Sequence, residues 1–153
     1  MEIERKFLIK KMPELDKYEY RDIEQVYILT EPVIRARKKD SDYILTVKGS
    51  GKMAREEFEL PLSEEAYNKL KSKAEGVVIT KRRYLIPYDK YLVELDVFDG
   101  SLKGLIMAEV EFPTIEEAEA FTPPDWFSED VTEDTSYHNS NMSKGTVPTC
   151  LRA

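Results

Sequence analysis

Charged residues recur at every second position within segments that otherwise read as β-strands. Glu2, Glu4 and Lys6 share one strand face, while Ile3 and Phe7 fall on the other. Antiparallel strands usually alternate an apolar face with a neutral or mixed polar one, so a face of pure charge is unusual. Because a slip of one residue would exchange the two faces of a strand, the parity of these charges strongly constrains the fold.

This pattern extends over seven predicted strands and includes eight acids and seven bases. The acids are Glu2, Glu4, Glu57, Glu59, Glu94, Asp96, Glu109 and Glu111, and the bases are Lys6, Arg35, Arg37, Lys48, Arg55, Lys81 and Arg83. One interpretation is a solvated outer face with cross-strand ion pairs, each worth at most a fraction of a kcal/mol. Adjacent like charges, such as Arg35 and Arg37, are poor choices for a surface of that kind. We therefore favour a closed barrel whose charged faces point inward, where acids gather cations and bases gather an anion.

Eight segments are predicted as strands, from period-two alternation or from β-branched and aromatic content. They cover residues 2–10, 19–30, 33–39, 42–49, 54–62, 77–87, 90–98 and 103–112. Helices are predicted over 63–75 and 114–121, with Ser63 and Thr114 as N-caps, and a short helix is predicted after Asp134. The predicted fold class is mainly β (α+β), an eight-stranded antiparallel closed barrel with flanking helices.

Composition and single residues exclude several classes of protein. Acids outnumber bases 30 to 23, and the net charge of −7 argues against nucleic acid or an anionic membrane as partner. No apolar run approaches the roughly 18 residues of a membrane span, and the N-terminus is unlike a signal peptide, so we expect a cytoplasmic protein. One cysteine, Cys150, and one histidine, His138, exclude an internal disulfide and a His-rich zinc site. The length of 153 residues favours one domain over residues 1–153.

A lumen of this composition suits a phosphorylated ligand together with a metal ion. Hard cations such as Mg²⁺ or Mn²⁺ prefer carboxylate oxygens, and a Glu-x-Glu strand places two carboxylates side by side. Lysine and arginine suit phosphate oxygens, and a triphosphate has about four negative charges near neutral pH. The glycine cluster at Gly49 and Gly51 lacks the spacing and the following helix of a P-loop.

The opening Glu2-Ile3-Glu4-Arg5-Lys6-Phe7 resembles the E-x-E-x-K signature of the CYTH superfamily, the triphosphate tunnel metalloenzymes. The resemblance extends over residues 2–144. It continues in order through Gln25-Val26-Tyr27, Arg35-Ala36-Arg37, Leu45-Thr46-Val47-Lys48, Glu57-Phe58-Glu59, Lys81-Arg82-Arg83-Tyr84, Glu94-Leu95-Asp96-Val97-Phe98 and Ala108-Glu109-Val110-Glu111-Phe112. The closing residues 134–140 look like the segment that forms the C-terminal plug helix of that family.

The resemblance implies a triphosphate tunnel that works with Mg²⁺ or Mn²⁺. By position, the phosphate ligands would be Lys6, Arg35, Arg37, Lys48, Lys81 and Arg83. The residues that would hold metal or order the attacking water are Glu2, Glu4, Glu59, Asp96, Glu109 and Glu111. Arg55, Glu57 and Glu94 either contact substrate or only balance the charge of the lumen. Lys81, Arg83, Glu4 and Tyr27 are the candidate catalytic residues. Tyr27 either tunes leaving-group protonation with Lys81 or forms a structural hydrogen bond.

The reaction that the resemblance implies is metal-assisted hydrolysis of a small-molecule triphosphate, with inorganic triphosphate (tripolyphosphate) as the leading substrate. Alternatives are a class IV adenylate cyclase, a thiamine or nucleoside triphosphatase, and a triphosphate- or polyphosphate-binding module without turnover. The resemblance also implies a homodimer as one oligomeric state of the protein. His138 is either a plain surface or capping residue or a catalytic acid, and Lys144 resembles a basic residue of the plug. Tyr84, Phe98, Phe112 and Trp126 are expected in the core on the outer face of the sheet.

Overall fold

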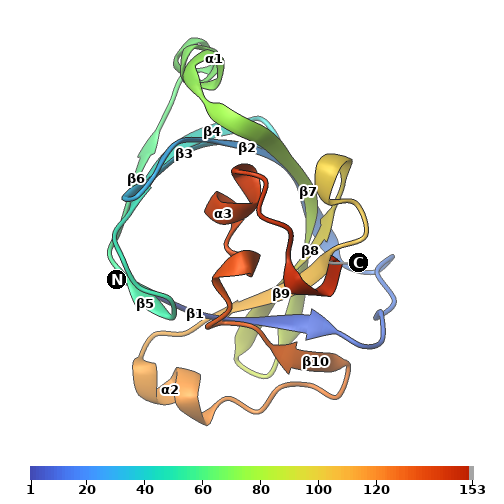
Figure 1. Ribbon diagram of the computed structural model, residues 1–153. Helices are drawn as coiled ribbons and strands as arrows, with labels where there is room; N and C mark the ends of the chain where they lie inside the picture. Colours follow the sequence, from blue (N-terminus) through green and yellow to red (C-terminus); the bar gives the residue numbers. More distant parts are fainter. Residues whose placement is uncertain (152–153) are drawn as a thin grey trace.

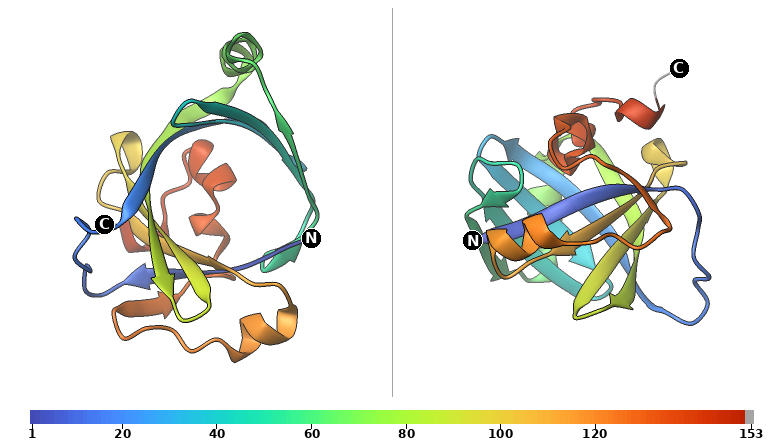
Figure 2. Two further views of the ribbon diagram at one scale, coloured as in Figure 1. Left: turned by 180° about the vertical axis from the view of Figure 1, so that it is seen from behind. Right: turned by 90° about the horizontal axis from the view of Figure 1, so that it is seen from below.

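A computed structural model describes residues 1–151, and the last two residues of the predicted domain 1–153 lie outside the described residues. One twisted antiparallel sheet closes nearly completely into a barrel (Figures 1 and 2). Its strands are β1 (Glu2–Ile9), β2 (Glu19–Thr30), β3 (Val33–Lys39), β4 (Asp42–Lys48), β5 (Ala54–Arg55), β6 (Glu57–Pro61), β7 (Glu75–Tyr88), β8 (Tyr91–Phe98), β9 (Ile106–Glu111) and β10 (Phe127–Asp130). The predicted fold class is thereby confirmed.

The segment between β4 and the first helix closes the barrel. The strand order is β10-β1-β9-β8-β7-β2-β3-β4-β6, and β5 pairs with β1. We predicted one strand over residues 54–62, which is wrong in detail because the chain breaks at Glu56. Before the break Arg55 pairs with Glu2 of β1, and after it Glu57 pairs with Lys48 of β4. These two short strands together occupy the eighth position around the barrel.

Two other strand predictions need correction. The strand predicted over 103–112 begins only at Ile106, because the 3-10 turn η1 (Gly100–Leu102) and the turn at residues 103–104 occupy the preceding positions. We did not predict β10, which is four residues long and follows the prolines at 123 and 124. It pairs with the second half of β1, where Phe7 lies opposite Asp130.

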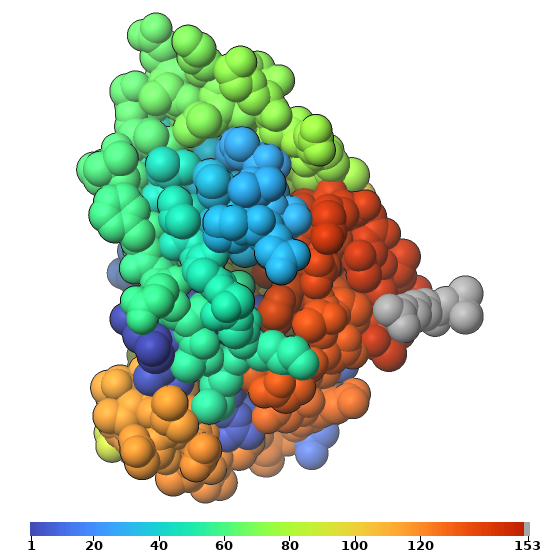
Figure 3. Space-filling model, turned by 60° about the vertical axis from the view of Figure 1, so that its left-hand side comes forward, coloured from blue at the N-terminus to red at the C-terminus, as the bar shows by residue number. Residues whose placement is uncertain are grey.

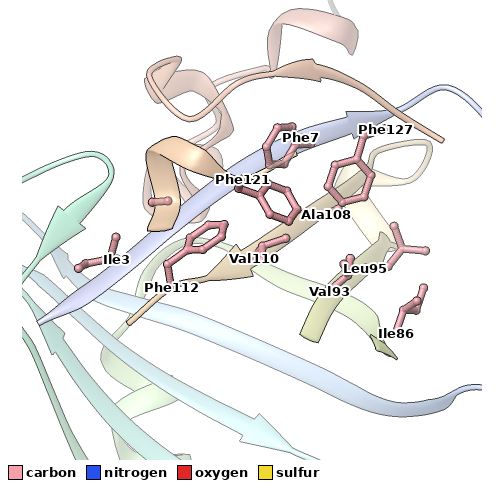
Figure 4. Packing of buried hydrophobic residues seen from close by; sticks show 11 residues of the cluster. Ile3, Phe7, Ile86, Val93, Leu95, Ala108, Val110, Phe112, Phe121 and Phe127 are labelled. Carbon is pink, nitrogen blue, oxygen red and sulfur yellow. The ribbon is translucent and has the colours of Figure 1, made fainter. Parts of the chain in front are cut away.

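Two helices lie on the outside of the barrel. The predicted caps are confirmed: the Ser63 hydroxyl accepts from the Ala66 N–H at 3.1 Å before α1 (Glu64–Lys73), and the Thr114 hydroxyl accepts from the Glu117 N–H at 3.1 Å before α2 (Ile115–Ala120). Helix α2 packs against the outer face of β1, and Phe127 of β10 joins the same apolar cluster. Figure 4 shows the apolar cluster there, which includes Phe7. No helix within residues 1–151 is long and apolar enough to cross a membrane.

The C-terminal residues enter one end of the barrel. The 3-10 turn η2 (Thr135–Tyr137) and α3 (Asn139–Ser143), which we call the plug segment (residues 135–143), lie inside the ring of strands in Figure 1. Tyr137 and Met142 pack there against lumen-facing apolar side chains such as Ile79 and Met107. Phe98 belongs to this cluster, so its expected place on the outer face is wrong. Phe98 is two residues from Asp96 and therefore shares its lumen-facing side of β8. At the end of the barrel that the plug segment fills, this side of the strand is apolar.

Candidate active site

Charged side chains from almost every barrel strand line a cavity in the lumen. The space that is not filled by atoms amounts to about 520 Å³, part of it open to solvent. Its lining consists of Glu2, Glu4, Lys6, Tyr27, Val33, Arg35, Arg37, Lys48, Arg55, Lys81, Arg83, Glu94, Glu109, Asn139 and Ser140. The expected inward orientation is confirmed for the charged members of this set.

Strand register explains why these side chains converge. Opposite residues of an antiparallel pair point to the same side of the sheet. Glu4 lies opposite Glu111 and Lys6 lies opposite Glu109 on β1 and β9, and Glu94 of β8 also lies opposite Glu109. The periodicity of two in each strand is therefore preserved from strand to strand around the barrel.

Lys81, Arg83 and Asp96 form a buried ion network on β7 and β8. Asp96 is completely buried, and its Oδ1 accepts from the Arg83 Nε at 2.8 Å. Its Oδ2 accepts from the Arg83 Nη2 at 2.9 Å and lies 2.7 Å from the Lys81 Nζ. Burial opposes ionisation of Asp96, but Arg83 and Lys81 outweigh it, so the pKa of Asp96 is lowered. For Lys81 burial is the larger effect and lowers its pKa to about 8, although Asp96 opposes it.

Arg35 and Arg37 lie on β3, which is separated from β7 by β2 alone. No carboxylate of residues 1–151 lies within 4.0 Å of either guanidinium. The Arg37 Nε donates to the Gln25 Oε1 at 2.9 Å, and an Arg35 Nη2 donates to the Thr46 hydroxyl at 3.0 Å. The Arg35 Nε is buried and has no hydrogen-bond partner in the described part of the chain. Burial, and then the neighbouring Arg35 charge, lower the pKa of Arg37 to about 9. Two adjacent buried cations without a counter-charge are typical of an anion site.

The carboxylates near β1 are crowded. Burial, and then the Glu109 charge, raise the pKa of Glu4 to about 7, while its nearest cation, the Lys6 Nζ, is 3.7 Å away. Glu2 lies 2.9 Å from the Lys48 Nζ, and burial opposes its ionisation, but Lys48 and a hydrogen bond to Glu57 together outweigh burial and lower the pKa of Glu2. Burial, and then a hydrogen bond to Glu2, raise the pKa of Glu57 to about 7. Like charges held this close favour protonation or a bound cation.

The structure separates some predicted metal ligands from this group. Both oxygens of Asp96 are occupied by Arg83 and Lys81, so it lies as their counter-ion beneath the cavity surface. Glu59 and Glu111 have the lumen parity but are exposed, and neither lines the cavity. Within residues 1–151, no three carboxylate, histidine or cysteine side chains lie close enough together to form a ready-made metal site.

His138 and Lys144, whose roles the sequence left open, lie at the plug end of the lumen. A second opening there lies between the turn 30–33, the loop 49–52 and the plug segment; Figure 3 shows the red C-terminal residues at the surface beside blue-green ones. Lys144 and His138 both line it. Among the residues that the structure describes, none forms a hydrogen bond with the buried His138 Nε2. Burial, and then the Lys6 charge, lower the pKa of His138 to about 4. His138 is thus a neutral residue in the ligand-free protein.

We missed Gln25 and Asn139 as members of the site. Gln25 is completely buried, and its Nε2 donates to the Tyr27 hydroxyl and to the Asn139 Oδ1, both at 3.1 Å. The Asn139 Oδ1 also accepts from the Lys81 Nζ at 3.1 Å. The spacing of Gln25 and Tyr27 was a signal for the first residue, because both lie on the lumen face. Asn139 gave no signal, since its place depends on the path of the plug.

Comparison with known proteins gives similarities over nearly the whole chain. The CYTH domain family matches residues 1–145. An inorganic triphosphatase of Nitrosomonas europaea is 38% identical over 148 residues, which cover 93% of this chain and 96% of that protein. An inorganic triphosphatase of Acetivibrio thermocellus is 35% identical over 155 residues, covering 94% and 93%. The crystal structure of an inorganic triphosphatase aligns with a TM-score of 0.71 and 34% identity over 97% of each chain.

Proposed function

The chain belongs to the CYTH domain family, and from this premise we propose that it is a metal-dependent enzyme that hydrolyses inorganic triphosphate in its tunnel. The observation that supports this most strongly is the pair Arg35 and Arg37, which are buried side by side facing the cavity without a carboxylate partner among residues 1–151. Burying two such charges is costly unless an anion neutralises them. Two relatives at 38% and 35% identity are inorganic triphosphatases, and this chain covers most of each.

The bases of the lumen would bind the phosphates. Arg35 and Arg37 offer planar groups with several N–H donors to phosphate oxygens, and Lys6 and Lys48 add point charges from neighbouring walls. Arg55, which lines the same cavity, would extend this set toward the plug-side opening, whose wall it also forms. Because these side chains are fixed by strand register, they would stabilise the charge that develops during phosphoryl transfer with little reorganisation.

The carboxylates near β1 fit a hard divalent cation. Burial, and then the Glu109 charge, raise the pKa of Glu4 to about 7, and the Glu2 charge acts in the same direction. Mg²⁺ or Mn²⁺ would relieve this repulsion, held by Glu2, Glu4 and Glu109, with Glu111 opposite Glu4 on the same face. A cation bound there neutralises phosphate oxygens and lowers the pKa of bound water. Glu59 at the exposed edge would act only as an outer ligand, and Asp96 as a counter-ion.

Lys81 would supply the proton that the leaving phosphate needs. Lys81, with a pKa of about 8, is mostly protonated at neutral pH and can donate a proton to the leaving phosphate. Arg83 stays charged because Asp96 and Glu94 outweigh the effect of burial and hold its pKa well above the ordinary value. The attacking group would be water, ordered by the Glu4 carboxylate. Tyr27 would donate a hydrogen bond to the substrate from beside Lys81.

The test is to identify products. Purified protein is incubated with tripolyphosphate, ATP or thiamine triphosphate, each with Mg²⁺, Mn²⁺ or EDTA, and products are resolved by ion chromatography. We expect orthophosphate and pyrophosphate from tripolyphosphate, with no turnover in EDTA. Arg37→Ala should lose the activity, and Lys69→Ala on the exposed face of α1 should keep it. Formation of cyclic AMP would support a cyclase instead, and tight binding without turnover would support a binding module.

Several finer points belong to the same proposal. We propose a cytoplasmic location and a single tunnel domain over residues 1–153. The homodimer also stays a prediction, which the mass of the protein in solution would check by light scattering.

A further inference from the structure

Between two walls of the lumen runs a chain of hydrogen bonds whose direction is fixed at both ends. Arginine and lysine side chains only donate hydrogen bonds. The Gln25 atom that accepts from the Arg37 Nε at 2.9 Å must therefore be the oxygen, which leaves its NH₂ group on the other side. Likewise, the Asn139 atom 3.1 Å from the Lys81 Nζ must be an oxygen.

The Gln25 amide is the centre of this chain. Its NH₂ group donates to the Asn139 Oδ1 and to the Tyr27 Oη, each at 3.1 Å. Since the Tyr27 oxygen accepts this bond, its own proton is free to point into the cavity that Tyr27 lines. Gln25 itself is completely buried and does not line the cavity. It therefore touches the residues around the substrate without reaching the substrate.

From this arrangement we infer that Gln25 is a positioning residue: its amide orients Arg37 and Tyr27 toward the phosphates and connects them, through Asn139 of the plug, to Lys81. This inference rests on the proposed function and adds a residue to its site. It also gives the plug a role in the reaction. Helix α3 lies against the lumen face of β2 and β7 (Figure 1). Its position there brings the Asn139 Oδ1 to the Lys81 Nζ as a hydrogen-bond acceptor.

Two substitutions separate the functions of the amide. Gln25→Met keeps the length of the side chain but removes the acceptor for Arg37 and both donors. Gln25→Glu keeps an acceptor for Arg37 but can no longer donate to Tyr27, whose hydroxyl would turn away from the substrate to donate to the new carboxylate. Asn68→Asp, on the exposed surface of α1, is the control for an added negative charge.

We expect Gln25→Met to lower kcat/KM for tripolyphosphate by roughly 10- to 100-fold, the scale for losing hydrogen bonds to a charged group. Gln25→Glu should lower kcat at least as much, and Asn139→Ala should lower kcat by more than it raises KM. In an Arg37→Lys background, Gln25→Met should cause at most a two- to threefold further loss, because its main partner is already gone. A purely structural Gln25 would instead give additive losses that follow thermal stability.

Binding provides a second arm that does not depend on turnover. Calorimetric titration of tripolyphosphate in EDTA should show roughly tenfold weaker binding by Gln25→Met than by the parent, and unchanged binding by Asn68→Asp. If the parent binds tripolyphosphate but hydrolyses none of the triphosphates, the proposed function fails and this arm still decides the role of Gln25. Equal affinities of parent and Gln25→Met, or additive losses in the Arg37→Lys background, would overturn the inference. So would a parent that does not bind tripolyphosphate at all.

Discussion

Replacing Glu4 with Gln should stabilise the ligand-free protein at alkaline pH while it removes the metal-dependent activity. Glu4 is 7% exposed, and burial, and then Glu109, raise the pKa of its carboxyl to about 7 from an ordinary value of 4.5. Above pH 7 the folded protein must therefore keep a buried carboxylate beside another one, whereas the unfolded chain solvates both. Glutamine keeps the shape of the side chain without this charge.

The magnitude follows from the two pKa values. Between pH 4.5 and 7 the folded protein binds more protons at Glu4 than the unfolded chain does, so the stability contributed by this group falls as the pH rises. At about 1.4 kcal/mol for each pH unit, the full difference is about 3 kcal/mol once the pH exceeds 7. For a chain of this length, that corresponds to roughly 6–12 °C in the melting temperature.

The assay is urea unfolding of parent and Glu4→Gln in EDTA at a series of pH values from 5 to 8. The difference in unfolding free energy should be near zero at pH 5 and grow to about 3 kcal/mol at pH 8 in favour of the variant. Addition of Mg²⁺ at pH 8 should stabilise the parent more than the variant. Glu14→Gln, at an exposed position, should show no such pH trend. A difference that does not change with pH would refute the buried, crowded carboxylate and the metal site built on it.

Other substitutions test other parts of the lumen. Arg37→Ala should weaken tripolyphosphate binding in EDTA by roughly 10- to 100-fold by calorimetry, and Arg37→Lys should recover only part of this because a point charge cannot replace the planar guanidinium. Asp96→Asn should destabilise the fold by about 3–5 kcal/mol in urea unfolding, because Lys81 and Arg83 lose their buried counter-ion. Glu111→Gln should need more Mg²⁺ for half-maximal activity, because a carboxylate ligand is lost. The stability should not fall, because burial and then Glu2 raise the pKa of Glu111 and already disfavour its charge. An unchanged Mg²⁺ requirement would exclude Glu111 as a ligand.

The inward direction of the charges could be predicted from the sequence because parity is a local property. Side chains two residues apart share a face whatever the strand pairs with, so Arg35 and Arg37, or Glu109 and Glu111, had to point the same way. Like charges in such pairs made an outer surface a poor explanation. The strand order was not needed for this step.

Depth along the barrel axis could not be predicted in the same way. Asp96 and Phe98 share a face with Glu94, but the plug covers one end of the lumen and leaves the other end open. Asp96 therefore lies beneath Lys81 and Arg83 as their counter-ion. The path of the plug depends on packing of residues distant in sequence, which no spacing within a strand encodes.

The way in which two short strands close the barrel could not be predicted from the sequence for a related reason. Residues 54–62 have the alternation of a single strand, but the chain changes partners at Glu56. Alternation reports which face a side chain takes, and it does not report which strand lies beside it. The short β10 was missed because its four residues follow a proline pair and contain three polar side chains.

The separation of charge across the barrel is the strongest argument that the lumen is built for a ligand. On β3, the neighbours of Arg35 in register are Tyr27 and Thr46, and those of Arg37 are neutral as well. A lumen optimised for stability alone would place a carboxylate at one of these positions. Instead, the strand order puts β9, with Glu109, four positions away on the opposite wall. Arg35 and Arg37 are therefore left with charge that a bound anion would neutralise, whereas Glu109 already has the Arg83 guanidinium at 3.8 Å. A metal–triphosphate complex would present its anion to Arg35 and Arg37 and its cation to the carboxylates of β1 and β9.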